Sequence, residues 1–312
     1  MSHSRHHYAQ RRRFLIQGSA LGAITALHSL GSWAAAQDTQ PGKLPGKGGK
    51  PRSAPALFIG HGSPMNAISE NAFTRSLNAL GQKLPPPKAL LVVSAHWLSP
   101  GVTAVNVAEH PPTIHDFGGF PAELQAMEYP APGSPHFARE AIRAVKGVKV
   151  VPTSEWGLDH GTWTVLHHLY PEAKIPVFQL SIDYARGPDF HYQLGRELAA
   201  LRQQGVMIIG SGNIVHNLRA TQRGLPEAMR ASQDWAQRFD EAFAGALAQR
   251  DDKRILDYTR LDAGANMAVP TPDHYFPMLY ALGAAGRDEP AETLFSGFHS
   301  GTLSMRCFGF GV

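Results

Sequence analysis

This chain has almost no cysteine, little charge and no long apolar run. A single cysteine among 312 residues, Cys307, excludes an intramolecular disulfide and a cysteine-based zinc site. Charged residues make up 17% of the chain and apolar residues 43%, so a sizeable core is available. The sequence contains no H-E-x-x-H or C-x-x-C pair. Any metal site must therefore be assembled from segments that are distant in the sequence.

The net charge of +4 is unevenly distributed along the chain. Residues 1–54 contain eight Lys and Arg against Asp38, a balance of +7, so the remaining residues carry −3. The basic character therefore belongs to the N-terminal segment. We expect no nucleic-acid binding, because the body of the protein is mildly acidic.

The N-terminal segment has the three parts of a secretory signal peptide over residues 1–36. Three arginines at 11–13 precede an apolar run from Ile16 to Leu30, and a small-residue patch ends at Ala36. The paired arginines followed by Phe14-Leu15 resemble a twin-arginine signal. The run is short for a membrane span, and an uncleaved anchor is the alternative interpretation. We expect export through the twin-arginine machinery, cleavage near Ala36, a periplasmic location and no stable membrane association after cleavage.

Residues 37–54 are rich in Gly, Pro and Lys and predict a disordered linker, followed by one domain over residues 55–312. In this domain, buried-strand patterns alternate with helical patterns. The predicted strands cover 56–59, 88–95, 102–107, 148–152, 175–182, 206–210, 294–298 and 302–308. The predicted helices cover 70–80, 136–145, 162–170, 189–203, most of 225–249 and a last helix that Thr271 caps; 109–135 is a long loop. This order indicates an α/β fold, a single domain with a mixed, largely parallel central sheet flanked by helices on both faces.

Histidine is abundant in this domain, with twelve of the sixteen in the chain. Four stand where a predicted strand ends or a helix begins: His61, His96, His216 and His274. A fifth, His160, lies in an Asp-His-Gly turn. Imidazole is a common ligand of Zn, Fe and Cu, and the carboxyl ends of strands in an open sheet meet at one edge. These histidines therefore predict a mononuclear metal site there, and for any one of them the alternative is a hydrogen-bonded core histidine.

The other histidines of the domain are interpreted as surface residues or as neighbours of the site. They are His110, His115, His136, His167, His168, His191 and His299. His115 lies in the long loop and could border the pocket. Trp97, Trp156 and Trp163 adjoin the site histidines and could stack on an aromatic substrate, although core packing is the more ordinary role for at least two of them.

Seven short motifs follow one another between Pro55 and the C-terminus. They are Ile59–Pro64, Val93–Trp97, Pro111–Phe117, Tyr129–Pro135, Asp159–Trp163, Gly212–Asn217 and Pro270–Tyr275. In sequence and in order they resemble those of the 4,5-DOPA extradiol dioxygenases, which belong to the class III (LigB-type) extradiol ring-cleavage superfamily. The resemblance covers the whole domain from about Pro55 to the C-terminus and leaves out only the N-terminal segment before it.

This resemblance implies one divalent metal ion, Fe(II) for ring cleavage or Zn(II) as bound. His61, His96 and His274 would hold it, and His216 would be a fourth ligand or an acid/base. His160 would be the general acid/base toward the substrate and dioxygen. The wider superfamily usually supplies two histidines and a glutamate. Here the matching positions are histidine. Asp273 or Asp159 could supply a carboxylate only as a neighbour of the ligands, not as a ligand itself.

Three interpretations remain open at this point. The first is an extradiol dioxygenase that opens the ring of a DOPA-like catechol with O2. The second is a zinc or iron enzyme of the same fold with non-oxidative chemistry, a hydrolase or lyase, because an all-histidine site suits zinc with an open position for water. The third is a non-enzymatic periplasmic metal-binding protein with a closed coordination shell. The sequence contains no Arg or Lys motif that points to a particular catechol.

Overall fold

Six strands in the order β5-β2-β6-β1-β10-β7 form the central sheet of this computed structural model, which describes residues 53–221 and 230–312. Four neighbouring strands are parallel: β5 (Val177–Gln179), β2 (Ala89–Ser94), β6 (Val206–Gly212) and β1 (Ala56–Gly60). The strands β10 (Cys307–Phe310) and β7 (Glu292–Phe295) continue the sheet in antiparallel pairing. The sheet is mixed and largely parallel, as the sequence predicts.

Two smaller sheets flank the central one. Strand β3 (Thr103–Asn106) pairs in parallel with β4 (Val150–Thr153). Strand β8 (Phe298–His299) forms an antiparallel hairpin with β9 (Leu303–Ser304). Two of the eight predicted strands, 102–107 and 148–152, therefore pair with each other outside the central sheet.

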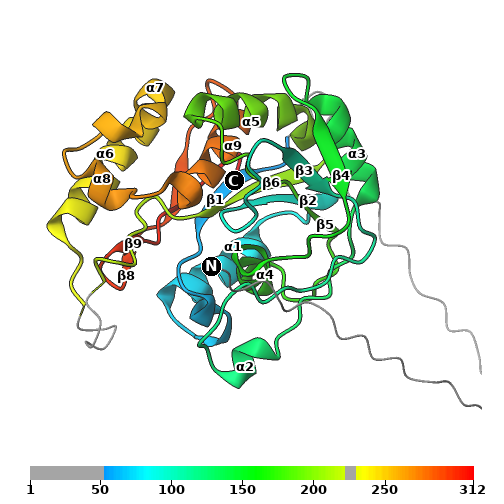
Figure 1. Cartoon of the computed structure of the whole chain (residues 1–312), viewed down its shortest axis with the longest axis horizontal. Helices are drawn as coiled ribbons and strands as arrows, with labels where there is room; N and C mark the ends of the chain where they lie inside the picture. Colours follow the sequence, from blue (N-terminus) through cyan, green and yellow to red (C-terminus); the bar gives the residue numbers. More distant parts are fainter. Residues whose placement is uncertain (1–52, 222–229) are drawn as a thin grey trace, which may run out of the picture. The chain divides into compact units, whose positions relative to one another are not determined.

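Helices cover both faces of the central sheet (Figure 1). On one face lie α3 (Pro135–Ala144), α5 (Pro188–Gln203) and α9 (Phe276–Ala284), and on the other lie α1 (Ala72–Lys83) and α4 (His160–Leu169). The shorter elements and the remaining helix are η1 (Pro64–Ile68), α2 (Ala122–Gln125), α6 (Asp234–Ala248), α7 (Asp252–Leu256), η3 (Tyr258–Arg260), α8 (Ala265–Ala268) and η4 (Pro272–His274). The predicted fold class is confirmed.

Alternation along the strands divides the core into two clusters. In β6, Val206 and Ile208 pack into the cluster beneath α5 and α9, whereas Met207 and Ile209 pack into the cluster beneath α1 and α4. Successive side chains of a strand point to opposite faces of the sheet, so a run that is apolar throughout is needed when helices cover both faces. This requirement explains why the strands appear in the sequence as continuous apolar runs.

Helix boundaries differ from the sequence predictions at three places. Helix α1 continues past Gly81 to Lys83, and Gly81 serves packing rather than termination: the carbonyl of Leu169 would lie 1.8 Å from a Cβ added there. Helix α4 begins at His160 rather than Thr162, because the side chain of Asp159 accepts from the Thr162 backbone N–H at 3.1 Å and caps the helix. Thr271 and Pro272 occupy the predicted N-cap and first helical positions, but they begin the 3₁₀ turn η4 rather than α9, and the Thr271 side chain makes no capping bond.

Other predictions are shortened by the structure or lie outside it. Of the predicted strand 175–182, only Val177–Gln179 forms a strand. The predicted long loop 109–135 contains the short helix α2. Within 225–249, the described helix begins at Asp234. The predicted signal peptide and residues 37–52 of the predicted linker lie outside the described residues. Ala54, near the end of that linker, donates its N–H to the carbonyl of Arg202 at 2.9 Å.

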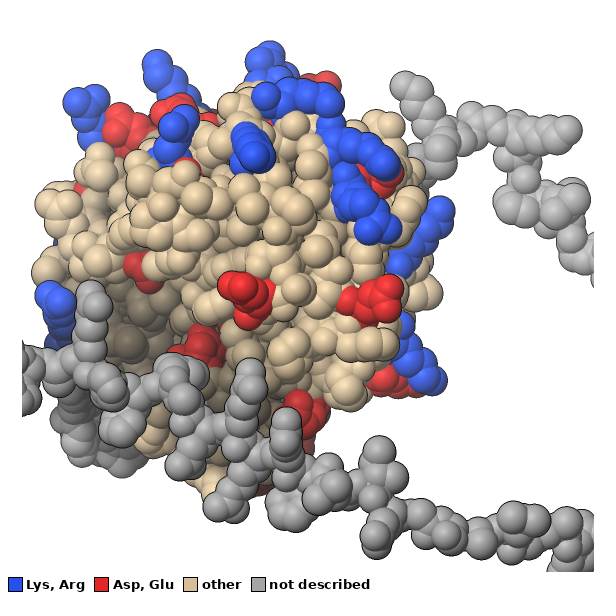
Figure 2. All heavy atoms as spheres, turned by 45° about the vertical axis from the view of Figure 1, so that its right-hand side comes forward, with Lys and Arg blue, Asp and Glu red and all other residues tan. Residues whose placement is uncertain are grey.

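The surface carries charges of both signs. Figure 2 shows Lys and Arg side chains along the upper and right-hand margins of one face, with Asp and Glu among them and on the area between. This face therefore offers a mixed surface rather than a basic one, in keeping with the acidic balance of the domain. Within residues 53–221 and 230–312, no helix is long and apolar enough to cross a membrane.

Candidate metal and substrate site

Five histidines gather at the carboxyl edge of the parallel strands. His61 follows β1, His96 and His216 lie shortly after β2 and β6, His274 ends η4, and His160 begins α4. Backbone bonds fasten these segments to one another. The His61 N–H donates to the carbonyl of Gly212 at 3.0 Å, and the Asn213 N–H donates to the carbonyl of His274 at 2.9 Å. The structure thus brings together all five histidines that the sequence singles out.

The rings of His61, His96 and His274 form a nearly equilateral triangle. The ring centres are 5.1 Å apart for His61 and His96, 5.3 Å for His61 and His274, and 5.1 Å for His96 and His274. A metal–nitrogen bond of about 2.0–2.1 Å holds a ring centre about 3.2 Å from the ion, so three imidazoles around one ion have centres about 5 Å apart. The Nε2 atoms of His61 and His96 lie 3.2 Å apart. The spacing of the three ring centres is thus the spacing expected of imidazoles around one divalent ion.

The protein fixes the outer nitrogen of two of these rings. The hydroxyl of Ser211 donates to the carbonyl of Gly161 at 2.5 Å, so its oxygen accepts from Nδ1–H of His61 at 3.0 Å. A carboxylate oxygen of Asp273 accepts from Nδ1–H of His274. Each bond holds the ring proton on Nδ1 and leaves the Nε2 lone pair for a metal, an arrangement usual for histidine ligands.

Burial keeps two of the rings neutral. Desolvation first, and then the proximity of His274, lower the pKa of His61 well below the ordinary value of 6.5. Desolvation and then the proximity of His160 lower the pKa of His96 in the same way. Only a neutral imidazole has a lone pair for a metal. Both residues therefore carry the charge state that metal binding needs at neutral pH.

His160 is held by a carboxylate from the long loop. Asp116 Oδ2 accepts from Nδ1–H of His160 at 2.9 Å, and Oδ1 accepts from the His160 backbone N–H at 2.8 Å. Burial by itself would raise the pKa of Asp116, but the hydrogen bonds and charge of His160 outweigh it and lower that pKa. The ionised carboxylate fixes the tautomer of the ring. Nε2 of His160 is then the nitrogen that can accept a proton.

His160 also lies within reach of a metal. His61, His96 and His160 can bring one nitrogen each within 4.8 Å of one another. The ring centres are less regular, however, with His160 3.8 Å from His96 and 5.8 Å from His61. His274 instead lies within such distances of a ligand atom each of His216 and Asp273, so the ligand atoms define two adjoining groups that could hold a metal.

His216 lies flat against His274. The two rings are stacked at 3.5 Å with an interplanar angle of 4°. Burial, followed by the proximity of His274, lowers the pKa of His216 to about 3, although Asp273 opposes this effect. His216 is therefore a neutral ring and a weak base at the edge of the triangle, with a nitrogen lone pair that suits a further ligand.

The two aspartates expected behind the ligands differ in what they contact. Asp273 bonds directly to His274, as described above. Asp159 is fully buried and accepts from Ser94 Oγ at 2.6 Å and from Gln179 Nε2 at 2.7 Å. Burial first, and then Asp116, raise the pKa of Asp159. Asp159 therefore braces the ends of β2 and β5 and the start of α4 rather than a histidine ring.

A cavity of about 400 Å³ opens over the five histidines. Its apolar wall consists of Phe117, Phe120, Leu218 and Leu303. The rest of its lining consists of the turn 62–64 and of three polar residues from the last third of the chain, Arg230, His299 and Ser300. This volume lies in the range of 300–1,000 Å³ that is usual for small-molecule sites, and apolar walls around a few polar groups are typical of them.

Two possibilities that the sequence left open for the cavity wall are not observed, and Trp97 and Trp163 are buried, in keeping with the core packing expected of at least two tryptophans. His115 does not line the cavity: its Nε2 contacts the carbonyl of Met127 at 3.0 Å, and its ring packs against Phe117 and Trp163. The three tryptophans are likewise absent from the described lining. Trp163 is fully buried, and Trp97 stacks on Trp156 at 5.6 Å. Phenylalanines supply the aromatic wall instead.

Comparison with known proteins matches nearly the whole domain to a single protein family. Residues 55–310 match the family described as the catalytic LigB subunit of aromatic ring-opening dioxygenase. The chain is 45% identical over 258 residues to the 4,5-DOPA dioxygenase extradiol of Escherichia coli K12, covering 80% of this chain and 92% of that protein. It is 38% identical to the protein of the same name from Beta vulgaris, covering 81% and 95% respectively.

The chain belongs to the LigB family. The crystal structure of an uncharacterized protein from Escherichia coli K12 is also similar, with a TM-score of 0.71 and 39% identity over 82% of this chain and 99% of that one. The family resemblance expected from the seven motifs is therefore confirmed. Membership makes this chain an extradiol aromatic ring-opening dioxygenase and decides among the three interpretations.

Sequence reasoning missed several residues of this LigB site. Asp116 and Ser211 orient His160 and His61, and Arg230 and Ser300 line the cavity. Asp116 directly follows a histidine in the long loop, and Ser211 follows the apolar run of β6, so each had a local signal. Arg230 had none, because it is a single basic residue in a polar segment.

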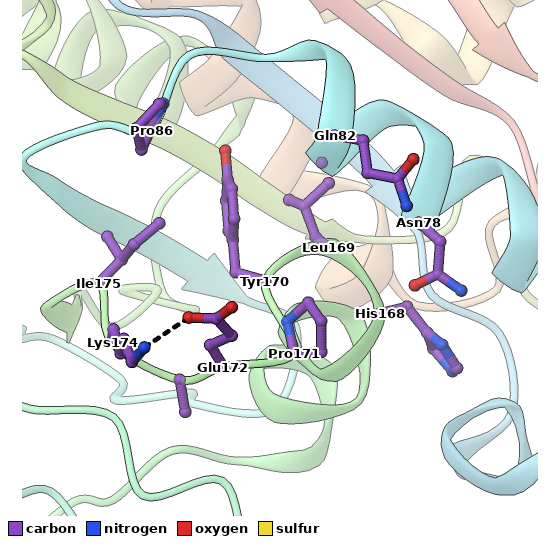
Figure 3. A pocket seen from close by; sticks show the side chains of 12 residues that line it. Asn78, Gln82, Pro86, His168, Leu169, Tyr170, Pro171, Glu172, Lys174 and Ile175 are labelled. Atoms are coloured by element: carbon purple, nitrogen blue, oxygen red, sulfur yellow. Dashed lines mark ion pairs between the residues drawn. The ribbon is translucent and has the colours of Figure 1, made fainter. Parts of the chain in front are cut away.

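A second cavity of about 400 Å³ lies away from the LigB site, between α1 and the segment after α4 (Figure 3). Asn78 and Gln82 of α1 face Tyr170 across it. Its charged residues, Glu172 and Lys174, pair with each other at 2.7 Å and are largely exposed. Within the described parts of the chain, the groups of side chains that could hold a metal lie at the histidine site and not here.

Proposed function

We propose that this chain opens the ring of a DOPA-like catechol with O2 at the histidine cavity, using one divalent metal ion held by His61, His96 and His274. The triangle of these rings is the observation that supports this ligand set, because its sides fit three bonds to one ion. The names of the curated relatives support DOPA or a similar catechol as the substrate. The cavity has room for a substituted ring beside the histidines.

We propose Fe(II) as the ion that works in ring opening. Bound there, Fe(II) would supply the redox chemistry that lets a catechol react with O2, whereas Zn(II) has no redox states to offer. The same neutral histidines also suit Zn(II), so zinc can occupy the site without supporting turnover. The all-histidine set departs from the two histidines and one carboxylate common among non-haem iron oxygenases.

The residues around the metal have separate tasks in this proposal. His160 accepts a catechol proton at Nε2, because Asp116 holds its other nitrogen protonated. His216 serves as a fourth ligand or an acid/base, and its lowered pKa, which keeps it neutral and makes it a weak base, favours the ligand role. Phe117 and Phe120 pack against the aromatic ring and exclude water from it.

An anaerobic preparation loaded with Fe(II) tests this function. Given DOPA, catechol or protocatechuate, it should consume O2 and form a yellow ring-opened product, while a Zn(II)-loaded sample should do neither. The Zn(II) sample is the matched control, because it has the same fold and an occupied site. Absence of O2 uptake by the Fe(II) enzyme across a broad panel of catechols would refute the proposal.

We further propose that the protein works in the periplasm after twin-arginine export and cleavage near Ala36. Support comes from the arginines, the apolar run and the small-residue patch in residues 1–36. Export of a folded protein would suit a chain that loads its metal before crossing the membrane. It would also suit a domain whose single cysteine, Cys307, is free and buried.

A further inference from the structure

Asn213 lies where several segments of the histidine site meet. It follows β6 on the chain that leads to His216, and it is 1% exposed. Its side-chain NH2 donates to the carbonyl of Ser304 at 2.7 Å, and its side-chain oxygen accepts from the Gly62 N–H in a longer bond of 3.4 Å. A carbonyl only accepts and an N–H only donates, so these two partners decide which way the amide is turned.

The backbone at Asn213 connects the segments that carry His61 and His274. The carbonyl of Gly212 accepts from the His61 N–H at 3.0 Å, and the Asn213 N–H donates to the carbonyl of His274 at 2.9 Å. A Cβ on Gly212 would lie 2.1 Å from that same carbonyl, so only glycine allows the segment of His274 to come this close. The peptide between Gly212 and Asn213 therefore lies between the two histidine segments and bonds to both.

The side chain of Asn213 holds this peptide in place. Its oxygen binds the residue after His61, and its NH2 group binds Ser304 of β9, so it is fastened on two opposite sides. The ring centres of His61 and His274 are 5.3 Å apart, and that separation depends on where their backbones are held. A change of the Asn213 side chain therefore loosens the spacing of the two rings while the peptide bonds to both segments can still form.

Ser304, the partner of the amide NH2 group, is itself fixed by a buried ion pair. Arg306 Nε donates to the two carboxylate oxygens of Asp240 at 3.0 and 3.1 Å, and Ser304 Oγ donates to Asp240 Oδ1 at 2.6 Å. The Arg306 N–H donates in turn to Ser304 Oγ at 3.2 Å. The side chains of Arg306 and Asp240 are only 11% and 7% exposed, and charged hydrogen bonds of this kind are strong and directional. Asn213 therefore bonds to a firmly held strand.

We propose that Asn213 is a positioning residue that sets the separation of His61 and His274 and thereby the affinity of the site for its metal ion. The proposal rests on the proposed function, because it takes these two histidines as ligands. Asn213 is not among the described residues that line the cavity, so it acts through the histidines and not on the substrate. Residues that hold metal ligands in place from outside typically contribute about 10–100-fold to metal affinity.

Metal binding by substituted proteins tests the proposal. The dissociation constant for Zn(II) is measured by competition with a chromophoric chelator, and the visible absorption spectrum is recorded after Co(II) is loaded in its place. Asn213→Ala should weaken Zn(II) binding about tenfold to a hundredfold and should shift the Co(II) bands, because the arrangement of the ligands changes. Asn213→Ser retains a hydroxyl that can serve one of the two partners, so its dissociation constant should lie between those of the wild type and Asn213→Ala.

Asn106→Ala is the matched control, because it removes the same kind of buried amide. Asn106 is 2% exposed, donates to the carbonyl of Trp156 and accepts from the Ala108 N–H at 2.8 Å. None of these three residues is in the described lining of the cavity. Both alanine variants should lower the urea midpoint of metal-free protein by similar amounts, since each leaves two buried groups without a partner. Asn106→Ala should nevertheless bind Zn(II) as the wild type does and keep its Co(II) spectrum.

The outcome is decided by affinity and spectrum, without turnover. If Asn213→Ala binds Zn(II) within about threefold of the wild type, or if Asn106→Ala loses as much affinity, Asn213 is an ordinary core residue and the proposal is wrong. Asn213→Ser decides in the same way where Asn213→Ala does not fold. If wild-type protein opens no catechol but Asn213→Ala still loses metal affinity as expected, the positioning role stands and the proposed function is refuted.

Discussion

Replacing Asp116 by Asn tests how His160 is prepared to accept a proton. Asp116 accepts from both the ring Nδ1 and the backbone N–H of His160. An asparagine of the same shape can turn its NH2 group toward Nδ1. The ring proton then moves to Nε2, and the nitrogen that should act as the base has no lone pair to offer.

The expected effect is large on turnover and small on folding. General acid/base catalysis contributes about 10²–10⁴ to a rate, or about 3–5 kcal/mol of barrier, so kcat of Asp116→Asn should fall by about this factor. Its KM should change less than about threefold, because the ring stays in place. The free energy of unfolding should fall by about 1–2 kcal/mol, at the lower end for a charged hydrogen bond because the Asp116 side chain is 18% exposed.

Steady-state O2 uptake with DOPA and the metal content after desalting provide the two readouts. Asp234→Asn, an exposed carboxylate in the first turn of α6, serves as the control and should match the wild type in both. His160→Ala should retain the metal and lose turnover. If Asp116→Asn retains kcat within about threefold, the assignment of His160 as acid/base is refuted. If His160→Ala loses its metal, His160 is itself a metal ligand.

Three further predictions concern the metal, acid stability and export. His61→Ala, His96→Ala and His274→Ala should each release the metal on desalting, and retention by any of them, measured by elemental analysis, would exclude that residue as a ligand. Burial lowers the pKa of His191 to about 4. As the pH falls below about 6.5, the unfolded chain therefore binds a proton at His191 while the folded chain does not, and the folded state loses stability. This single residue should cost metal-free protein about 2 kcal/mol of unfolding free energy between pH 6.5 and 5, and urea titrations of His191→Gln should show that much less loss. The double change Arg11→Lys and Arg12→Lys should stop periplasmic accumulation, and undiminished export would argue against the twin-arginine route.

Much of the fold could be predicted from the sequence because its signals are local. The apolar runs of β1, β2 and β6 are bounded by Gly, Pro or Ser, and each is followed at short distance by a histidine. Strands covered by helices on both faces must be apolar throughout, so these runs indicated a parallel sheet before any contact was known. The helix boundaries were predicted less well, because α1 and α4 end and begin where packing and a side-chain cap allow.

The sequence by itself determined that histidines follow the apolar strands and that they meet at one edge of the sheet, because parallel strands place their carboxyl ends at a common edge. Only the tertiary structure decided which partner each ring has. The hydrogen-bonded partners are far apart in the sequence: Asp116 and His160 by 44 residues, Arg230 and Ser300 by 70, and Ser211 and His61 by 150. Such pairings depend on loop paths and strand neighbours, which no local pattern encodes. The tautomers of His61 and His160 and the charged wall of the cavity are consequences of that packing.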